Sequence, residues 1–230
     1  MNALILLAGG SGSRMGSAVP DKILAHLNGK PVIAYAFEAF IASGLIDQFC
    51  IVYRDASQRA EIENSLQAFK QTIEFVQGGK TRQESVLNAL QTLPSECTQV
   101  FIHDAARPLI TAGAIKNLHA ALETNPAAVL AHPVKDTIKR VPESGTLQAT
   151  QLEDLDRSRL WAMETPQAFA FQKILEAYTT AKQDGIQLTD DAAAASHVGM
   201  PVTLVSNPDP NPKITRAEDF SYLESLLQAR

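Results

Sequence analysis

Short apolar runs alternate along the chain with longer segments of helical periodicity, and this alternation constrains the fold more than any other feature. We predict strands at 2–8, 48–54, 72–77, 98–103, 127–134 and 201–206, and helices at 31–43, 56–70, 82–93, 112–124, 171–184, 190–198 and 216–229. Strands that alternate with helices form a mostly parallel sheet with helices on both faces. The predicted fold class is therefore α/β and Rossmann-like, with ligands expected at the carboxyl ends of the strands.

A glycine-rich loop at 7–22 follows the first strand directly and carries two cations. Gly9, Gly10 and Gly12 have no Cβ, so the backbone N–H groups of the loop can approach phosphate oxygens closely. Arg14 and Lys22 add positive charge that backbone dipoles cannot supply. The loop predicts a polyphosphate site, with a nucleoside triphosphate as its ligand.

Two other interpretations of this loop are open, a dinucleotide-binding turn and a plain tight connection. A dinucleotide turn runs into a long helix, whereas Pro20 comes four residues after Gly16 and lacks the N–H that a helix interior needs. The acid that would bind a ribose about 20 residues further on is also missing, because after Asp21 the next carboxylates are Glu38 and Asp47. The dinucleotide interpretation is therefore the weaker one.

Composition excludes several classes of protein. A chain of 230 residues with 45% hydrophobic residues is long enough for one large or two small domains with a sizeable core. A formal net charge of -5 argues against a nucleic-acid or anionic-membrane partner. No apolar run is long enough for a signal segment or a membrane span, and Cys50 and Cys97 lack metal-site spacing, which indicates a reducing compartment. We predict a cytoplasmic protein.

Cations gather in other loops that the fold should bring to the first one. Gly78–Arg82 follows the third predicted strand and His103–Pro108 follows the fourth. The carboxyl ends of parallel strands meet at one edge of the sheet, so these loops are expected to converge on one site. A small phosphorylated ligand suits that pattern, although a solvated surface charge is the alternative for any single lysine.

One stretch, 136–158, interrupts the alternation. Its two partly alternating runs flank Pro142–Gly145, which is typical of a β-hairpin. A hairpin this polar is marginally stable alone, so packing on a second copy of the chain is the simplest explanation. The alternative is a disordered surface flap. We predict a projecting β-arm that supports a homodimer.

Nine motifs occur in an order that carries a family resemblance. They are Ala8–Met15, Pro20–Lys22, Gly78–Val86, His103–Pro108, Asp136–Arg140, Asp156–Trp161, Thr165–Gln167, Thr189–Asp191 and Lys213–Thr215. Together they resemble the 2-C-methyl-D-erythritol 4-phosphate cytidylyltransferases of the non-mevalonate isoprenoid pathway over nearly the whole chain. The first motif, Ala8–Met15, and the third, Gly78–Val86, resemble nucleotidyltransferases generally, whereas Asp136–Arg140 and Asp156–Trp161 favour this family over the related ribitol-5-phosphate cytidylyltransferases.

The resemblance implies transfer of CMP from CTP to methylerythritol phosphate, with Mg²⁺ as cofactor and pyrophosphate as product. It also implies one nucleotidyltransferase domain over 1–230, with 136–158 as the dimerisation arm. The implied catalytic residues are Arg14 and Lys22, which stabilise charge in the transition state, and Arg157 and Lys213, which orient the substrate phosphate. CTP would contact Ala8, Gly9, Gly10, Gly12, Gly79, Ser85 and Ala105. The acceptor would contact Asp104, Arg107, Thr137, Thr165 and Thr189, with Asp104 also a metal ligand.

Structural interpretations compete with some of these roles. Asp104 and Arg107 could form an i,i+3 salt bridge that only fixes their loop, and the Thr189–Asp191 segment could only cap the helix that follows it. His103 is expected to be a hydrogen-bonded structural residue, because a phosphate nucleophile is already ionised and needs no general base. Thr215 and Glu218 predict a capping box that opens the last helix.

Further expectations concern the core and the departures from the family pattern. Trp161 and Phe169 are expected in the core, as is Cys50. Asp21 lengthens the spacing between Arg14 and Lys22 by one residue relative to the usual pattern, so it could displace Lys22. The competing functions are a sugar- or polyol-phosphate cytidylyltransferase and, more distantly, a non-catalytic nucleotide-binding module or a dinucleotide oxidoreductase.

Overall fold

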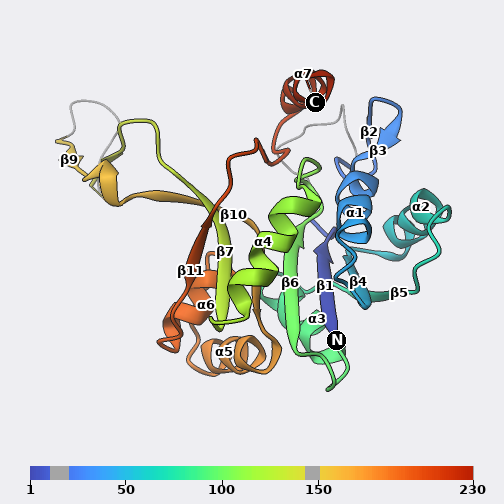
Figure 1. Ribbon diagram of the computed structural model, residues 1–230, viewed down its shortest axis with the longest axis horizontal. Coiled ribbons are helices and arrows are strands. Elements are labelled where there is room, and N and C mark those ends of the chain that lie inside the picture. Colours follow the sequence, from blue (N-terminus) through green and yellow to red (C-terminus); the bar gives the residue numbers. More distant parts are fainter. Residues whose placement is uncertain (11–20, 143–150, 230) are drawn as a thin grey trace.

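A seven-stranded mixed sheet forms the centre of the protein (Figure 1). The computed structural model describes residues 1–10, 21–142 and 151–229. The strand order is β11-β7-β10-β6-β1-β4-β5, with β10 antiparallel to both of its neighbours and the other pairs parallel. The strands are β1 (Asn2–Leu7), β4 (Gln48–Tyr53), β5 (Ile73–Gln77), β6 (Gln99–Asp104), β7 (Ala127–Pro133), β10 (Trp161–Ala170) and β11 (Thr203–Ser206).

Helices cover both faces of the sheet because the buried strands are apolar on both sides. Along β1, Leu4 and Leu6 point into one core cluster, and Ala3 and Ile5 point into the other. The first cluster includes side chains of α1, α2, α4 and α7, and the second includes those of α3, α5 and α6. The helices are α1 (Val32–Ser43), α2 (Ala56–Leu66), α3 (Arg82–Thr92), α4 (Ala112–Leu122), α5 (Phe171–Gln183), α6 (Asp191–His197) and α7 (Asp219–Gln228).

The predicted α/β class is confirmed, and each predicted strand and helix is present with shifted ends. The long antiparallel strand β10 was missed. Pro166 lies in its middle, which argues against a central strand because proline cannot donate to the ladder. The structure accommodates Pro166, whose bond to Thr165 is cis, where the β10–β7 register shifts between Met163 and Gln167. Proline at a strand irregularity explains the miss.

The capping prediction for the last helix is wrong. Helix α7 begins at Asp219 rather than near 216. The N–H groups of Thr215 and Arg216 donate to the Asp219 carboxylate at 2.6 and 2.8 Å, and the Thr215 hydroxyl donates to it at 3.0 Å. Glu218 does not reach back to Thr215 in this way, so the acid that closes the turn lies one residue later than expected.

The core predictions are mostly confirmed. Phe169 and Cys50 are fully buried, and Cys97 is also buried. Trp161 is the exception, because it is 37% exposed at the start of β10, where the strand leaves the body of the protein. Among the residues described, no helix is both long and apolar enough to cross a membrane.

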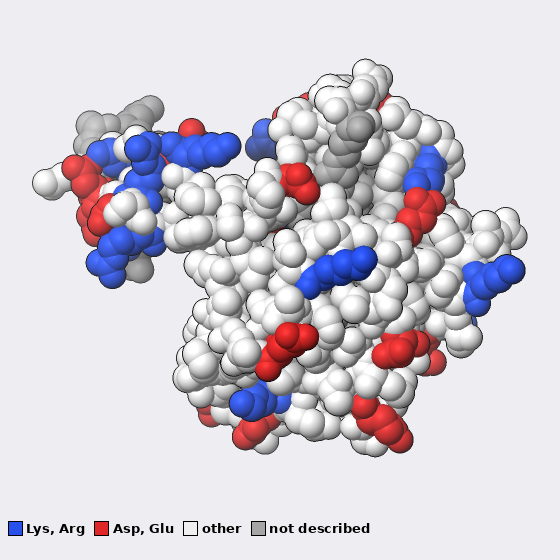
Figure 2. Space-filling view, in the orientation of Figure 1, with Lys and Arg blue, Asp and Glu red and all other residues white. Residues whose placement is uncertain are grey.

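A narrow arm leaves the body between β7 and β10 (Figure 1). Its strands β8 (Lys139–Arg140) and β9 (Glu153–Asp154) pair antiparallel, which confirms the predicted hairpin pairing. Ion pairs join Lys139 to Asp154 and Arg140 to Glu153 across the two strands. Figure 2 shows basic and acidic side chains gathered together on this arm. A second small hairpin, β2 (His26–Leu27) with β3 (Lys30–Pro31), precedes α1.

Candidate active site

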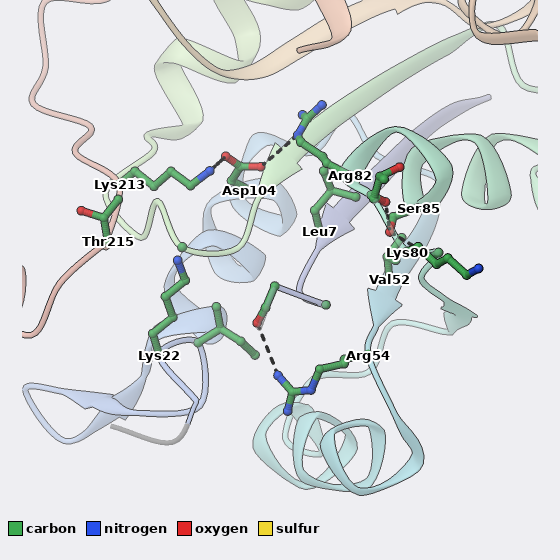
Figure 3. A pocket seen from close by; sticks show the side chains of 16 residues that line it. Leu7, Lys22, Val52, Arg54, Lys80, Arg82, Ser85, Asp104, Lys213 and Thr215 are labelled. Atoms are coloured by element: carbon green, nitrogen blue, oxygen red, sulfur yellow. Dashed lines mark hydrogen bonds and ion pairs between the residues drawn. The ribbon is translucent and has the colours of Figure 1, made fainter. Parts of the chain in front are cut away.

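A cavity of about 480 Å³ lies at the carboxyl ends of β1, β4 and β6 (Figure 3). The predicted loops converge on it: the start of the glycine loop, the segment after β5 and the end of β6 all contribute to its wall. The C-terminal segment before α7 closes the wall. The predicted site residues that line it are Gly9, Gly10, Lys22, Gly79, Ser85, Asp104 and Lys213.

The other predicted residues lie elsewhere. Ala8 and Ala105 are buried at the ends of β1 and β6, beside the residues that line the cavity. Arg107 is half-buried and Thr165 is buried, and neither lines the cavity; Thr189 is exposed before α6. Thr137 and Arg157 are exposed on the arm, where the Arg157 guanidinium donates to the Lys135 carbonyl at 2.8 Å. Gly12 and Arg14 lie outside the described residues.

The wall of the cavity is strongly basic. Lys22, Arg54, Lys80, Arg82 and Lys213 line it, whereas Asp104 is its one acid among the residues described. Cations crowded into one cavity repel one another unless anions lie between them. The cavity is therefore suited to a polyanion such as a triphosphate.

Charges of alternating sign run from the protein interior to this wall. Lys213 Nζ lies 2.6 Å from one oxygen of Asp104, and Arg82 Nε lies 3.7 Å from the other (Figure 3). The Arg82 guanidinium also donates at 2.8 and 2.6 Å to both oxygens of Asp191, which is fully buried. The Tyr178 hydroxyl donates to Asp191 as well. This charge chain fixes the acid between the two cations.

The charge chain sets the ionisation of Asp104. Burial alone would raise the pKa of Asp104, but attraction from Lys213 and Arg82 outweighs it and lowers that pKa to about 2. Burial would likewise lower the pKa of Arg82, and the attraction of Asp191 raises it instead. Asp104 is thus an anion at neutral pH.

Of the two competing structural interpretations, the contacts contradict one and confirm the other. Arg107 donates to the Asn211 carbonyl at 2.7 Å, and among the described residues Asp104 pairs with Lys213 and Arg82 rather than with it. The i,i+3 salt bridge is therefore not formed. The capping interpretation of Thr189–Asp191 is confirmed at Asp190, whose side chain accepts from Ala193 N–H at 2.9 Å.

Asp21 does not displace Lys22. One Asp21 oxygen accepts from Gln58 Nε2 at 2.7 Å and lies 3.3 Å from the Arg54 guanidinium, so the acid points toward α2. Lys22 points into the cavity, where its Nζ donates to the Ile214 carbonyl at 2.9 Å (Figure 3). Lys22 thereby lies beside the segment that carries Lys213.

The segment between β5 and α3 fits closely around Gly79. Gly79 N–H donates to the Ser85 hydroxyl at 3.0 Å, and that hydroxyl donates to the Thr81 carbonyl at 2.8 Å. A Cβ built on Gly79 would lie 2.3 Å from the Glu84 Cβ, too close for any real contact. Only glycine allows this approach, which places Gly79 against the first turn of α3 at the cavity wall.

His103 does not line the cavity. Its Nε2 lies 3.1 Å from the Arg107 carbonyl, which can only accept, so Nε2 carries the proton. The Thr165 hydroxyl then donates to Nδ1 and accepts from Asp104 N–H, each at 3.1 Å. Burial lowers the pKa of His103 to about 4. These contacts support the structural role predicted for it.

Three cations of the cavity had no individual predicted role: Arg54, Lys80 and Arg82. Lys80 and Arg82 lie in the segment Gly78–Arg82 that was expected at the site. Arg54 follows β4 directly, so the rule that ligands lie at strand carboxyl ends could have found it as well. Asp191 offered no such signal, because its place in the first turn of a helix already explained an acid there.

Comparisons with known proteins agree with this geometry. The family described as IspD, 2-C-methyl-D-erythritol 4-phosphate cytidylyltransferase, matches residues 2–229. The protein of that name from Synechococcus elongatus is 40% identical, over 99% of this chain and 96% of its own length. The one from Symbiobacterium thermophilum is 38% identical, over 98% of this chain and 92% of its own.

Solved structures show the same fold. The 4-diphosphocytidyl-2C-methyl-D-erythritol synthase of Anaerococcus prevotii superposes with a TM-score of 0.87 at 26% identity and covers 99% of this chain and 96% of its own. The Francisella tularensis 2-C-methyl-D-erythritol 4-phosphate cytidylyltransferase superposes with a TM-score of 0.80 at 26% identity, covering 98% and 99%.

Gly79→Ala should weaken nucleotide binding. The added Cβ cannot coexist with Glu84, so the Gly79 segment must move away from α3 and out of contact with a bound nucleotide. We expect the Kd for CTP, measured by calorimetry, to rise at least about tenfold, the equivalent of about 1.4 kcal/mol of lost hydrogen bonding. Gly113→Ala is the control, because its Cβ would meet only Thr111 Oγ at 3.8 Å. Equal affinity in both variants would contradict this account of Gly79.

His103 should make the fold sensitive to mild acid. Its folded pKa of about 4 lies below the unfolded value of 6.5, so the unfolded chain takes up a proton first as the pH falls. Stability from this residue is complete above pH 6.5 and declines toward pH 4, by about 2 kcal/mol between pH 7 and pH 5. Urea unfolding at both pH values should show this loss in wild type and in the control His26→Gln, but not in His103→Gln. Parallel losses in all three proteins would contradict the assignment.

Proposed function

The chain belongs to the 2-C-methyl-D-erythritol 4-phosphate cytidylyltransferase family, and we propose that the basic cavity at the strand ends is where its reaction takes place. The enzyme transfers CMP from CTP to methylerythritol phosphate in the non-mevalonate isoprenoid pathway. The observation that carries the proposed location is the ring of cations around Asp104, on the side of the sheet where such folds bind ligands.

The reaction needs charge stabilisation rather than covalent catalysis. An oxygen of the substrate phosphate forms a bond to the α-phosphorus of CTP, and the bond from that phosphorus to the β-phosphate bridging oxygen breaks. Negative charge builds on the α-phosphoryl group and on the leaving pyrophosphate. Catalysis is then positioning and electrostatic stabilisation by fixed cations. Lys22 points into the cavity and stabilises this negative charge. We assign the same role to Arg14.

The cavity wall divides between the two substrates. Gly79, Ser85 and Ala105 receive the cytidine, because the close approach at Gly79 leaves backbone groups and one hydroxyl at the cavity surface. Gly9, Gly10 and Gly12 receive the triphosphate through their backbone. The contribution of Ala8 is indirect, because its N–H donates to the Val52 carbonyl at 2.9 Å and its carbonyl accepts from Gln58 Nε2 at 3.0 Å.

The acceptor side centres on Asp104 and Lys213. Lys213 exchanges its contact with Asp104 for the substrate phosphate, which it orients for attack. Arg107, Thr165 and Thr189 remain proposed acceptor contacts. The Thr165 hydroxyl already supports the Asp104 backbone, which favours an indirect contribution from Thr165.

A divalent cation fits the same wall. Asp104 is an anionic carboxylate at the end of β6, and no group of three or more potential metal ligands occurs among the described residues. Mg²⁺ commonly binds one or two carboxylates together with substrate phosphates and water. Asp104 would hold it with the triphosphate, and the cation would neutralise part of the triphosphate charge.

The arm is proposed to complete the site of a second copy. Thr137 and Arg157 are exposed on the arm, away from the cavity of their own chain. Ile138, Val141 and Leu152 are exposed there too, and Trp161 and Met163 are exposed at its base. Apolar side chains held out on a two-stranded hairpin favour a partner surface. In the proposed homodimer, Arg157 of each arm serves the other chain's cavity.

Two wider assignments accompany this proposal. Residues 1–230 act as one nucleotidyltransferase domain, because β1 and β11 lie in the same sheet. A cytoplasmic location, with neither nucleic acid nor membrane as partner, stays a prediction from the sequence.

Pyrophosphate release tests the activity directly. Purified protein with CTP and Mg²⁺ should release pyrophosphate rapidly with methylerythritol phosphate, slowly with ribitol phosphate and at background without acceptor. Chelation of the divalent cation should abolish release and added Mg²⁺ should restore it. Faster release with ribitol phosphate would favour a polyol-phosphate enzyme instead, and release that survives chelation would exclude the cation's role.

Subunit exchange tests the shared site. Lys22→Ala should lower turnover by about 10²–10³, the usual effect of removing a group that meets transition-state charge, and Arg157→Ala should be similarly impaired. In a mixed dimer of the two variants, one site has both defects and the other has neither. With random pairing about half of the dimers are mixed, so activity should recover to roughly a quarter of wild type.

The control for exchange is mass spectrometry of the mixed sample. A mixture that stays inactive although mixed dimers are present would place Arg157 in its own chain's site. Near-normal turnover of Lys22→Ala alone would remove Lys22 from the transition state.

A further inference from the structure

The loop that carries Lys213 is poor in backbone donors. It runs from Asn207 to Lys213 and contains Pro208, Pro210 and Pro212, none of which has an N–H. It belongs to no helix or strand. A loop of this kind cannot be held along its length by a backbone ladder, so side chains must fix its course.

Backbone bonds hold the two ends of this loop. Asn207 N–H donates to the Ala131 carbonyl at 3.0 Å, and Ile214 N–H donates to the Ala106 carbonyl at 2.8 Å. Between these two anchors the chain has to place the Lys213 side chain in the cavity.

One buried carboxylate ties the interior of the loop to the sheet. Asn207 Nδ2 and Asn211 Nδ2 both donate to the same oxygen of Glu164, each at 2.9 Å. Glu164 lies on β10 and is 5% exposed, and its other oxygen lies 2.6 Å from His132 Nδ1. Both oxygens are therefore engaged, which fixes the carboxylate itself.

The same tether continues into the active site. Asn211 Nδ2 also donates to the Thr165 carbonyl at 2.9 Å, and the Asn211 carbonyl accepts from Arg107 at 2.7 Å. Two residues further on, Lys213 Nζ lies 2.6 Å from Asp104. Glu164 itself does not line the cavity.

We propose that Glu164 is a positioning residue for cytidylyl transfer: by binding Asn207 and Asn211 it sets the course of loop 207–213 and so places Lys213 for the acceptor phosphate. The inference rests on the proposed location of the reaction and on the acceptor role of Lys213. Glu164 acts through the loop and touches neither substrate.

Glu164→Leu keeps the side-chain volume and removes the acceptor of both asparagines. The loop should shift by an ångström or so, and kcat/KM for methylerythritol phosphate should fall by about 10². The Kd for CTP should stay within about twofold of wild type, because the nucleotide contacts lie on other loops. A merely structural role would weaken both substrates alike.

Glu164→Gln is the matched conservative variant. Its amide oxygen can accept from both asparagines, and its NH₂ group can donate to Nδ1 of a neutral His132. Activity should remain within about threefold of wild type. A loss in Gln as large as in Leu would mean that the charge, and not the tether, matters, and would overturn the proposal.

The decisive measurement combines Glu164→Leu with Lys213→Ala in single-turnover assays. If Glu164 acts by placing Lys213, Glu164→Leu should cost less than about twofold once Lys213 is gone. An undiminished loss of about 10² in that background would overturn the proposal. If Glu164→Leu does not fold, Asn207→Ala with Asn211→Ala removes the tether from the loop side and should give the same loss, again only while Lys213 is present.

Wild type is assayed beside the variants with CTP and methylerythritol phosphate. No turnover by wild type would reject the proposed function, whereas wild-type turnover with an unimpaired Glu164→Leu would reject only the positioning role.

Discussion

The contact on which the active site depends is the ion pair between Arg82 and the fully buried Asp191. Asp191 anchors the guanidinium from the interior, Arg82 then faces Asp104, and Asp104 holds Lys213 at the opposite wall. Each charge in this series is bounded by charges of opposite sign, so basic side chains can share one cavity before any polyanion binds. Removal of Arg82 would leave the buried Asp191 carboxylate uncompensated, which is far costlier than loss of an exposed ion pair.

The contacts of the charge chain also show which parts of the site could not be predicted from the sequence. The helices and every strand of the central sheet except β10 could be predicted, because local periodicity encodes them. Gly9 and Gly79 could be found because loops at strand ends and a family resemblance both point to them, and Lys213 because the family resemblance does. Arg82 and Asp191 are 109 residues apart, and the acid has an adequate local explanation at a helix start, so no local pattern predicts their contact. Strand β10 was missed for a related reason, since Pro166 is tolerated only at an irregularity that tertiary pairing creates.

The arm is stabilised differently from the body of the protein. Its described strands consist of two residues each, joined by exposed ion pairs that contribute little in water. Ile138, Val141 and Leu152 stay exposed beside them, so the arm contributes no core of its own. A two-stranded hairpin is marginally stable by itself and is stabilised when it packs on another surface. Thr137 and Arg157 lie on such an arm. Their placement is therefore explained most simply if the partner surface that stabilises the arm also carries the cavity to which these two residues contribute.

Loop 207–213 also holds an active-site residue in place, but it is fixed by side chains of its own chain. Three prolines restrict the unfolded chain and so reduce the entropy lost when the loop is ordered, but they also remove the donors that would ordinarily fix its course. Glu164 supplies that fixation from a site outside the cavity. The separation matters because Lys213 must leave Asp104 when a substrate phosphate arrives. A loop held by Asp104 alone would loosen at that moment, whereas a loop held by Glu164 keeps Lys213 in place while its side chain changes partners.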